Sequence, residues 1–532
     1  MTASAIDTQS LPEASTAIQR KVIIAACFGT FLEWYDFLTF ATLATYFSIL
    51  FFPPDNPVAA LLASLATFGV GMIVRPLGAA LFGSLGDKYG RRPIFIATIL
   101  LMGIATFCVG LLPTYAQVGM LAPALLLLLR LLQGFAVGGE IGGAAVYLTE
   151  HAPDNKRGFY TSALQLMGPL GILVSMLQVV LLQAYLTDDQ FREWGWRIPF
   201  LLSALLLAIS MKSRINMIES PVFERLRKKN ALSRTPLRDS LTDRHTLGRM
   251  ALLFFCISAG GSLLFFSSQV YTNVYLKNVV RLDPQTAGTL VMLSTIVLFP
   301  LTLFCGWLSD KIGRRPVLLA GLLLGMLSLI PIYTGLMHYG NPALERFNRE
   351  VPVVLHGSAC AYDPFTPTRN DCERNQELLT KLGVTYSLHP SAQASVVYIG
   401  QSRAVTGFNP EQLTATLKAQ GWTAQADPQQ AHKLMLFLLL LIPVTAVALI
   451  TGPQTATLAE LFPARTRYTS VALPHNLSAG WIGGLSPFMV TWLSVKAGNA
   501  VSGLWYPVGL LILAFCVGLL FLPETRNTPL DD

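Results

Sequence analysis

The sequence predicts an all-α membrane protein with twelve transmembrane helices in two six-helix pseudo-repeats and a small α+β insert between helices 9 and 10. Hydrophobic residues make up 52% of the chain and charged residues only 13%, about half the charged share of an ordinary soluble domain. Two similar basic loops, at 83–93 and 306–316, each join two long apolar runs. A repeated loop between membrane-length helices is typical of transporters built from two related halves.

Twelve apolar runs have the length of about 20 residues that crosses the hydrocarbon core. They lie near 22–50, 59–84, 93–112, 121–148, 160–184, 198–212, 249–275, 287–309, 316–338, 433–457, 468–494 and 505–522. The first run follows a polar stretch and is too long for the apolar core of a signal peptide, so no cleavable signal peptide is expected.

These spans divide the chain into seven parts. The parts are an N-terminal tail (1–21), a six-helix bundle (22–212), a central loop (213–248), helices 7 to 9 of a second bundle (249–338), the insert (339–432), helices 10 to 12 (433–523) and a C-terminal tail (524–532).

Lysine and arginine concentrate in the even-numbered connections between spans, for example around Arg91, Arg157, Lys228 and Arg314. Short loops rich in these residues stay in the cytoplasm. Both termini are therefore predicted to be cytoplasmic and the insert extracytoplasmic. The net charge of +8 follows from this asymmetry and from contact with lipid headgroups, so no nucleic-acid partner is expected.

The position of the insert follows from a mismatch between repeats. The two basic loops begin 223 residues apart, at Gly83 and Gly306, whereas a second matched pair of strings begins 310 residues apart, at Glu150 and Glu460. The added segment is polar, with a predicted strand at 395–400 and a predicted helix at 409–420. It also holds Cys360 and Cys372, which form a candidate disulfide in an oxidising compartment. A decoration without a function of its own is the alternative interpretation.

Several short strings then allow a comparison with known families. They are Phe31-Leu-Glu33-Trp34-Tyr35-Asp36-Phe37, Arg75-Pro76-Leu77-Gly78, Arg130-Leu-Leu-Gln133-Gly134, Glu219-Ser220-Pro221 and Glu460-Leu-Phe-Pro463. With the repeated Gly-x3-Asp-x2-Gly-Arg-Arg loop, they resemble the major facilitator superfamily and, within it, the metabolite:H+ symporter family. Members transport α-ketoglutarate, shikimate, citrate, dicarboxylates, and proline or betaine. The resemblance implies the major facilitator fold and covers nearly all of the chain except the insert and the N-terminal tail.

The repeated loops are candidate gates. Each pairs an aspartate with nearby arginines, and the glycine between them permits a sharp turn before the next helix. The resemblance implies a cytoplasmic gate that stabilises the outward-facing state. Its candidate residues are Asp87, Arg91 and Arg92 in the first half and Asp310, Arg314 and Arg315 in the second. In the alternative interpretation these arginines only fix the topology.

Five ionisable residues lie inside apolar spans, namely Glu33, Asp36, Arg75, Arg130 and Glu140. Each costs about 3 kcal/mol or more at mid-bilayer unless it has a partner or faces water. The three acids are candidate proton carriers, with Asp36 or Glu140 favoured, and the two arginines are candidates for attracting an organic anion. The alternatives are interfacial water around Glu33 and Arg130, and an interhelical hydrogen bond for Glu140.

Other polar or aromatic residues in the spans are candidates for gripping the rest of the substrate. They are Tyr35, Gln133, Gln269, Tyr271, Asn476 and Trp481, with Asn273, Gln454 and His475 as further polar candidates. Tyr271 and Trp481 are equally compatible with helix packing or with an interfacial position. Gly-Pro and Ser-Pro pairs at 168–169, 452–453 and 486–487 predict kinks that allow the two halves to rock.

The sequence therefore predicts a proton-coupled symporter that imports a small carboxylate-bearing metabolite, such as α-ketoglutarate, citrate or shikimate, across a bacterial inner membrane by alternating access. The alternatives are a carrier of a zwitterion such as betaine or proline, and a transporter-like sensor whose insert reads a ligand. No histidine or cysteine cluster and no phosphate-binding Gly-Lys-Ser loop occurs in the sequence, so no catalytic site, metal or cofactor is expected. The expected partners are an organic acid, protons and lipids, with a monomeric chain.

Overall fold

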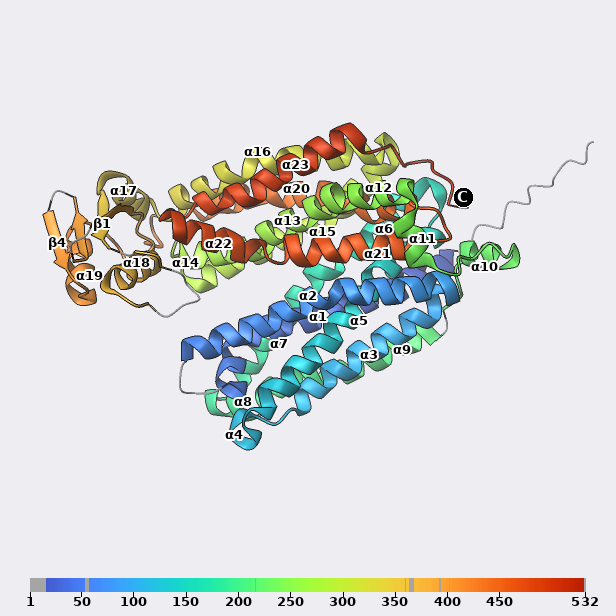
Figure 1. Ribbon diagram of the computed structural model, residues 1–532, viewed down its shortest axis with the longest axis horizontal. Coiled ribbons are helices and arrows are strands. Elements are labelled where there is room, and N and C mark those ends of the chain that lie inside the picture. The colour runs from blue at the N-terminus through green and yellow to red at the C-terminus, as the bar shows by residue number, and fades with distance from the viewer. Residues whose placement is uncertain are drawn as a thin grey trace, which may run out of the picture.

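The computed structural model describes residues 16–52, 57–215, 217–358, 360–362, 368–391, 394–400 and 402–530. Most of the predicted N-terminal tail and part of the first predicted loop lie outside the described residues. Two long helical bundles lie side by side, and a small domain extends from one end of the C-terminal bundle (Figure 1). We call that end of the molecule the insert end, and the end with the two basic loops the loop end.

The N-terminal bundle follows the predicted order of spans. Its long helices are α1 (Thr16–Phe51), α2 (Pro57–Tyr89), α3 (Arg91–Leu111), α5 (Leu121–His151), α7 (Met167–Tyr185) and α9 (Ile198–Ile215), with short helices α4 (Tyr115–Val118), α6 (Arg157–Gln165) and α8 (Asp188–Glu193). Several helices run past the predicted spans, because backbone hydrogen bonding continues beyond the point where the apolar run meets charged side chains. Helix α2, for example, includes Asp87 and Lys88.

The C-terminal bundle repeats this arrangement with more interruptions. One continuous helical run comprises α12 (Arg244–Leu252), α13 (Ala259–Phe265) and α14 (Thr272–Asn278), joined by the π-helical segments η3 (Leu253–Ser258) and η4 (Phe266–Tyr271). The other long helices are α15 (Pro284–Ile312), α16 (Arg314–Gly340), α20 (Lys433–Glu460), α21 (Arg467–Leu477), α22 (Ser486–Ala497) and α23 (Trp505–Phe521). A π-helical segment, η5 (Ser478–Gly483), follows α21. Such segments often mark functional sites.

Ten helical runs among the described residues are long and apolar enough to cross a membrane. The remaining two predicted spans correspond to α1 and to the run of α21, η5 and α22. The prediction of an all-α membrane fold with a small insert is confirmed. Both basic loops turn at a glycine in the left-handed region, Gly90 with φ 115° and Gly313 with φ 107°, a conformation that glycine adopts without steric cost.

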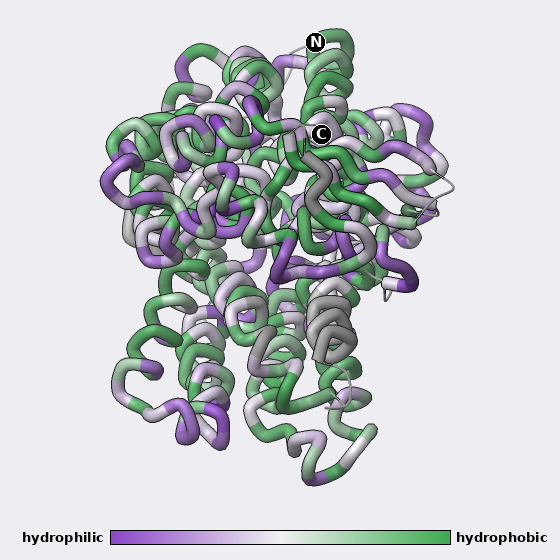
Figure 2. The backbone as a smooth tube through the Cα atoms, turned by 90° about the vertical axis from the view of Figure 1, so that its left-hand side faces the viewer, coloured by the Kyte–Doolittle hydropathy of each residue, from purple (hydrophilic) through white to green (hydrophobic). Residues whose placement is uncertain are grey.

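The insert is an α+β domain. It contains helices α17 (Pro342–Glu350), α18 (Asp371–Lys381) and α19 (Pro410–Ala419), and strands β1 (Val353–Gly357), β2 (Ser387–Pro390), β3 (Val396–Ile399) and β4 (Ser402–Thr406). The strand order is β2-β1-β3-β4, with β1 parallel to β2 and the other pairs antiparallel. Leu355 pairs with Val397 in the register, and both are buried in the insert's own core. Hydrophilic segments alternate with hydrophobic ones in this domain (Figure 2).

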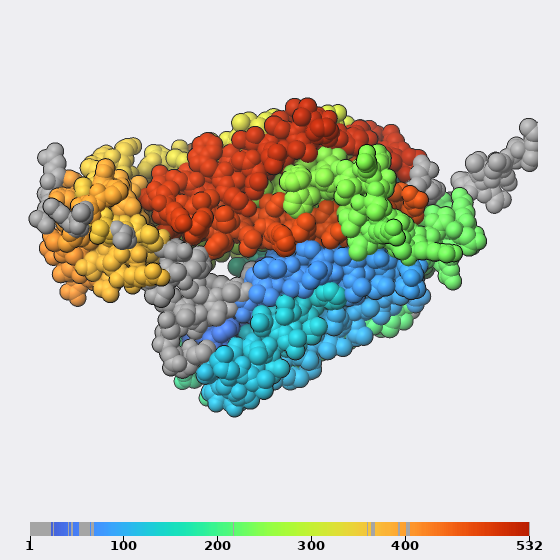
Figure 3. All heavy atoms as spheres, viewed as in Figure 1, coloured from blue at the N-terminus to red at the C-terminus, as the bar shows by residue number. Residues whose placement is uncertain are grey.

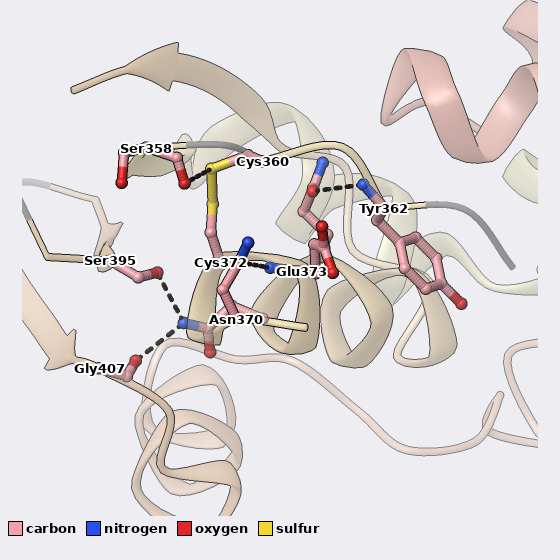
Figure 4. The surroundings of a disulfide bond; sticks show 10 residues. Ser358, Cys360, Tyr362, Asn370, Cys372, Glu373, Ser395 and Gly407 are labelled. Carbon is pink, nitrogen blue, oxygen red and sulfur yellow. Dashed lines mark hydrogen bonds between the residues drawn. A yellow bond between two sulfur atoms is a disulfide. The ribbon is translucent and has the colours of Figure 1, made fainter. Parts of the chain in front are cut away.

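A disulfide joins Cys360 to Cys372 beside the start of α18 (Figure 4). Asn370 caps this helix by accepting a hydrogen bond from the Glu373 amide at 2.9 Å. Asn375, further along the helix, donates to Ser395 Oγ at 3.0 Å and to the Gly407 carbonyl at 2.8 Å. The disulfide and these hydrogen bonds tie α18 to the neighbouring loops.

Two short helices of the central connection, α10 (Pro221–Lys228) and α11 (Pro236–Thr242), lie at the loop end. The two bundles meet where α2 and α5 pack against α21, and where α6 packs against α15 and α20. Their atoms are in contact along the loop-end part of the molecule (Figure 3).

Candidate functional site

A cavity of about 70 Å³ lies between the two bundles, near the middle of the helices. Such a volume has room for water or for part of a small ligand. Its polar lining residues from the N-terminal bundle are Thr30, Arg75 and Gln165, and those from the C-terminal bundle are Ser262, Thr302, Thr451, Gln454 and His475. Both bundles therefore contribute to one central cavity.

Arg75 on α2 is the charged group of this cavity, and Glu33 on α1 lies behind it. The distance from Arg75 Nη1 to Glu33 Oε1 is 3.5 Å, and both side chains are buried. Among the described residues, no donor makes a hydrogen bond to either carboxylate oxygen of Glu33. Removing a carboxylate from water without hydrogen bonds is costly, so this acid depends on Arg75 for compensation.

Asp36 and Arg130 form a second buried ion pair, at 3.3 Å. Gln133 Nε2 donates to Asp36 Oδ1 at 3.1 Å and to Thr106 Oγ1 at 2.9 Å. The Arg130 guanidinium lies 3.7 Å from the centre of the Phe40 ring. This pair lies inside the N-terminal bundle, and its members are not among the residues that line the central cavity.

Glu140 on α5 forms a third buried pair with Arg214 on α9. Thr98 Oγ1 donates to Glu140 at 3.1 Å, and Arg214 Nη1 donates to the Phe95 carbonyl at 2.8 Å. A Cβ atom at Gly29 would clash with both charged side chains, so a glycine there leaves room for them. This arrangement resembles the interhelical bond that the alternative interpretation of Glu140 describes.

Sequence reasoning missed Arg214, because the sixth span was placed at 198–212 and the helix continues to Ile215. The available signal was an arginine directly after a long apolar run. Trp34, Gln165, Phe265 and Phe266, all of which line the cavity, were not singled out as substrate contacts either.

Three predicted substrate contacts make hydrogen bonds within their own bundle. The Tyr35 hydroxyl bonds Gln178 and, at 3.0 Å, the carbonyl of Pro199. Gln269 accepts a hydrogen bond from Thr295 at 2.6 Å. Gln133, as described above, supports Asp36. None of these three residues is among the described residues that line the cavity.

The other three predicted contacts also lie elsewhere. Tyr271 packs against Tyr333, with ring centres 5.5 Å apart. Asn476 donates to the Gly138 carbonyl across the bundle interface, at 3.0 Å. Trp481 is 50% exposed. The cavity instead receives Gln454 and His475 from the second half.

An aromatic layer closes the cavity on the insert side. The Trp34 and Phe265 rings, from opposite bundles, have centres 5.5 Å apart. Phe37, Met72 and Phe266 form a buried cluster beside them. Because Phe37 follows Trp34 on a helix that runs toward the insert end, this cluster lies between Arg75 and that end. The barrier on this side consists of apolar side chains.

Polar contacts close the loop end. Asp87 accepts hydrogen bonds from the amides of Tyr468 at 3.1 Å and Thr469 at 2.8 Å, in the first turn of α21. Asp310 accepts from the amides of Gly158 and Phe159, both at 2.8 Å, in the first turn of α6. Each aspartate therefore binds a helix N-terminus of the opposite bundle, where the helix dipole favours a negative charge.

We call the contacts of Asp87 and of Asp310 with the opposite bundle the first and the second latch. One further glutamate extends each latch across the interface, Glu150 in the first and Glu460 in the second. In the first latch, Arg91 lies 3.5 Å from Asp87 and 3.4 Å from Glu150, and Arg467 of the other bundle lies 3.0 Å from Glu150. The second latch is its counterpart. There, Arg314 lies 2.7 Å from Asp310 and 3.3 Å from Glu460, which Arg157 approaches at 3.8 Å.

The second arginine of each loop has a different position. Arg92 donates to the Ile215 carbonyl at 2.6 Å and Arg315 to the Leu519 carbonyl at 2.7 Å, both within their own bundle. Of the six predicted gate residues, four therefore make contacts in the two latches, whereas these two arginines fix the loop to its own bundle.

Comparisons with known proteins agree with this architecture. A family model described as "Sugar (and other) transporter" matches residues 22–244. The inner membrane metabolite transport protein YhjE of Escherichia coli (strain K12) is 32% identical over 517 residues, which cover 96% of each chain. The glycine betaine/proline/ectoine/pipecolic acid transporter OusA of Dickeya dadantii (strain 3937) is 30% identical over 519 residues, 96% of this chain and 84% of OusA.

Among solved structures, the proton:xylose symporter XylE bound to 6-bromo-6-deoxy-D-glucose superimposes with a TM-score of 0.62. The alignment covers 97% of this chain and 98% of XylE at 17% sequence identity. At that identity the likeness concerns the fold alone.

Proposed function

The chain belongs to the major facilitator superfamily, in its metabolite:H+ symporter family, and we propose that it imports a small zwitterion, such as betaine or proline, together with protons. As a member of this family it is a multi-pass membrane transporter and not an enzyme. The likeness to XylE confirms the predicted major facilitator fold. The zwitterion was the alternative in the sequence analysis, and the following observations favour it over an organic acid.

The charge balance of the central cavity carries the proposal. Arg75 can bind the carboxylate of a substrate, and among the described lining residues it is the one lysine or arginine. Because Glu33 lies 3.5 Å from it, the pair has no net charge. A di- or tricarboxylate would bring two or three negative charges into a site with a single compensated cation, at a large desolvation cost. A zwitterion brings no net charge.

The aromatic side chains of the cavity can bind the ammonium end of such a substrate. Trp34, Phe265 and Phe266 line the cavity on its insert side. A substituted ammonium group is attracted to the faces of aromatic rings, and tryptophan binds it best. We therefore place the carboxylate of the substrate at Arg75 and its ammonium group against this layer. That OusA is named as a transporter of glycine betaine and proline supports the same substrate class.

Competition for Arg75 supplies a mechanism of coupling. When a substrate carboxylate binds the guanidinium, Glu33 loses its compensating charge and has no described hydrogen-bond donor to replace it. Taking up a proton then stabilises Glu33, so substrate and proton load together. Asp36 and Glu140 keep their own partners, Arg130 and Arg214, during this exchange. We therefore propose Glu33 as the proton carrier.

The two closures suggest a direction of transport. With the loop end in the cytoplasm of a bacterial cell and both termini inside, the latches hold the inner side shut. Opening of the aromatic layer then admits substrate from outside. Rocking of the bundles breaks the contacts of Asp87 and Asp310 with the helix N-termini and releases substrate and proton inside.

Uptake into proteoliposomes with an imposed inward proton gradient tests the proposal. Radiolabelled glycine betaine and proline are compared with succinate and α-ketoglutarate, using the parent protein, Arg75→Ala and a control, Arg227→Ala, whose side chain is 69% exposed. We expect gradient-driven accumulation of a zwitterion by the parent and the control, and none by Arg75→Ala. Accumulation of the acids alone would overturn the substrate class, and equal uptake without the gradient would overturn the coupling.

A further inference from the structure

A second cavity lies at the junction of the insert with the C-terminal bundle. Its volume is about 320 Å³, which is within the range of small-molecule sites, about 300–1,000 Å³. Helices α14, α16 and α22 and the loop that follows α22 form its bundle side. Helix α17 and residues 380–386 form its insert side. The cavity therefore exists only because the insert is docked on the bundle.

Specific contacts hold this junction together. Arg281, in the loop between α14 and α15, donates to the Ala424 carbonyl at 2.8 Å, and its guanidinium lies 5.3 Å from the Trp422 ring centre. The Ala426 amide donates to the Arg281 carbonyl at 3.0 Å, and the Tyr386 amide to that of Gly498 at 3.3 Å. Arg281 has φ 64°, an unfavourable conformation for a side-chain-bearing residue that such contacts maintain.

The walls of the cavity have a definite chemical character. Tyr271, Tyr275 and Tyr386 line it, and all three are buried. Burial raises the pKa of the Tyr386 phenol, so this ring stays neutral. Glu345, whose Oε2 lies 2.7 Å from His338 Nδ1, is the acid of the lining, and no lysine or arginine occurs among the described lining residues. Neutral aromatic rings beside one carboxylate attract a cation and disfavour an anion.

We propose that this cavity is a second ligand site, separate from the central one, for a small organic cation or zwitterion with a substituted ammonium group. The ammonium group lies near Glu345, and its alkyl groups contact the tyrosine rings. This assignment follows from the cavity's own walls and does not depend on the proposed transport substrate.

The position of the site connects it to the central cavity. Tyr271 and Tyr275 continue the helical run whose Phe265 and Phe266 line the central cavity. The π-helical segment η4 begins at Phe266, which lines the central cavity, and ends at Tyr271, which lines the second cavity. A ligand held by the two tyrosines therefore contacts the same run that carries half of the aromatic layer.

Equilibrium binding of radiolabelled choline and glycine betaine to the full chain in lipid nanodiscs tests this site. The chain carries Arg75→Ala so that the central cavity does not contribute. We expect saturable binding of both probes that succinate does not displace. Glu345→Gln should weaken the affinity for choline about tenfold, because an ion contact with the ammonium group is lost. Ala500→Trp, at a small lining residue, is expected to abolish binding of both probes by filling the cavity.

Two control variants match these changes. Glu350→Gln neutralises an exposed acid on the same helix, and Ala419→Trp adds the same bulk at the exposed end of α19; both are expected to bind like the parent. Absence of saturable binding, displacement by succinate, or unchanged binding in both Glu345→Gln and Ala500→Trp overturns the proposal. Failure of the transport proposal appears separately, as normal uptake by Arg75→Ala while binding at the junction persists.

Discussion

The two bundles share a fold and a latch but differ in the charge that they bury. Apart from the latch, the described helices of the N-terminal bundle contain three buried ion pairs, Glu33 with Arg75, Asp36 with Arg130, and Glu140 with Arg214. Between the latch and the terminal turns at the insert end, where Lys277, Lys433 and Lys496 lie, the described helices of the C-terminal bundle contain no Asp, Glu, Lys or Arg.

In this part of the C-terminal bundle, the buried polar contacts are hydrogen bonds between neutral groups. The Tyr333 hydroxyl donates to the Ser267 carbonyl at 2.7 Å and lies 2.8 Å from Thr272 Oγ1. Thr295 bonds Gln269, and Ser258 lies 2.9 Å from His475 Nδ1. The difference teaches that the duplicated scaffold and its latch serve both halves, whereas the buried charge lies in one half, to which we also assign the proton.

Removing Arg75 should have the largest effect. Arg75→Ala leaves Glu33 as an uncompensated buried charge, and we expect uptake to fall about 100-fold or more. The double variant Glu33→Gln/Arg75→Ala should recover thermal stability, because no unpaired buried charge is left, but not uptake, because no cation binds the substrate. Melting temperature and initial uptake rate distinguish these two roles; equal instability of single and double variants would contradict the pairing.

Glu33→Gln should separate exchange from accumulation. An amide cannot take up a proton but occupies nearly the same space, so we expect substrate exchange within about threefold of the parent and no accumulation driven by a proton gradient. Counterflow and gradient-driven uptake measure the two processes in the same vesicles. The control is Glu224→Gln, at an acid that is 42% exposed. Gradient-driven accumulation by Glu33→Gln would transfer the role to Asp36 or Glu140.

The latches should respond alike, in contrast to the buried pairs. Asp87→Asn and Asp310→Asn each weaken charge-assisted hydrogen bonds to a helix N-terminus, by about 1–2 kcal/mol. Spin labels at Tyr89 and Arg465, both exposed residues on opposite bundles at the loop end, report the opening. We expect both variants to shift the distance distribution to longer values by similar amounts. A shift in only one of them would show that the latches are not equivalent.

Tyr333→Phe should have the smallest effect. It removes one hydroxyl from a neutral network and leaves the buried Ser267 carbonyl without that donor, at a cost of about 1 kcal/mol in the free energy of unfolding. Thermal denaturation in detergent measures it, with Tyr185→Phe as control because that side chain is 85% exposed. Loss of coupling in Tyr333→Phe would contradict the division of labour between the bundles.

The sequence predicted the scaffold well because its signals are local. Apolar runs, basic loops and turn residues each depend on a few neighbouring positions, and a mismatch between two repeats located the insert. Five of the six residues in the three buried pairs were also identified, since a charge inside an apolar run stands out at any position, whereas Arg214 lies just beyond the predicted end of its span.

Which of those residues pair with each other could not be predicted from the sequence, because it depends on how helices far apart in sequence pack. Glu33 and Asp36 are three residues apart and so share a face of α1, yet one meets Arg75 on α2 and the other Arg130 on α5. In the second half the signal was weaker still. Tyrosine, tryptophan and glutamine are common in packed helices, so Gln454 facing the cavity and Gln269 facing a neighbour look alike in sequence.

The place of the insert within the chain has a consequence for biogenesis. Helices α16 and α20 pack closely against each other, but the whole insert with its disulfide is synthesised between them. In the proposed orientation, this polar domain has to be exported before the second helix of the pair can enter the bilayer beside the first. In that orientation, completion of the C-terminal bundle therefore waits for translocation of the insert.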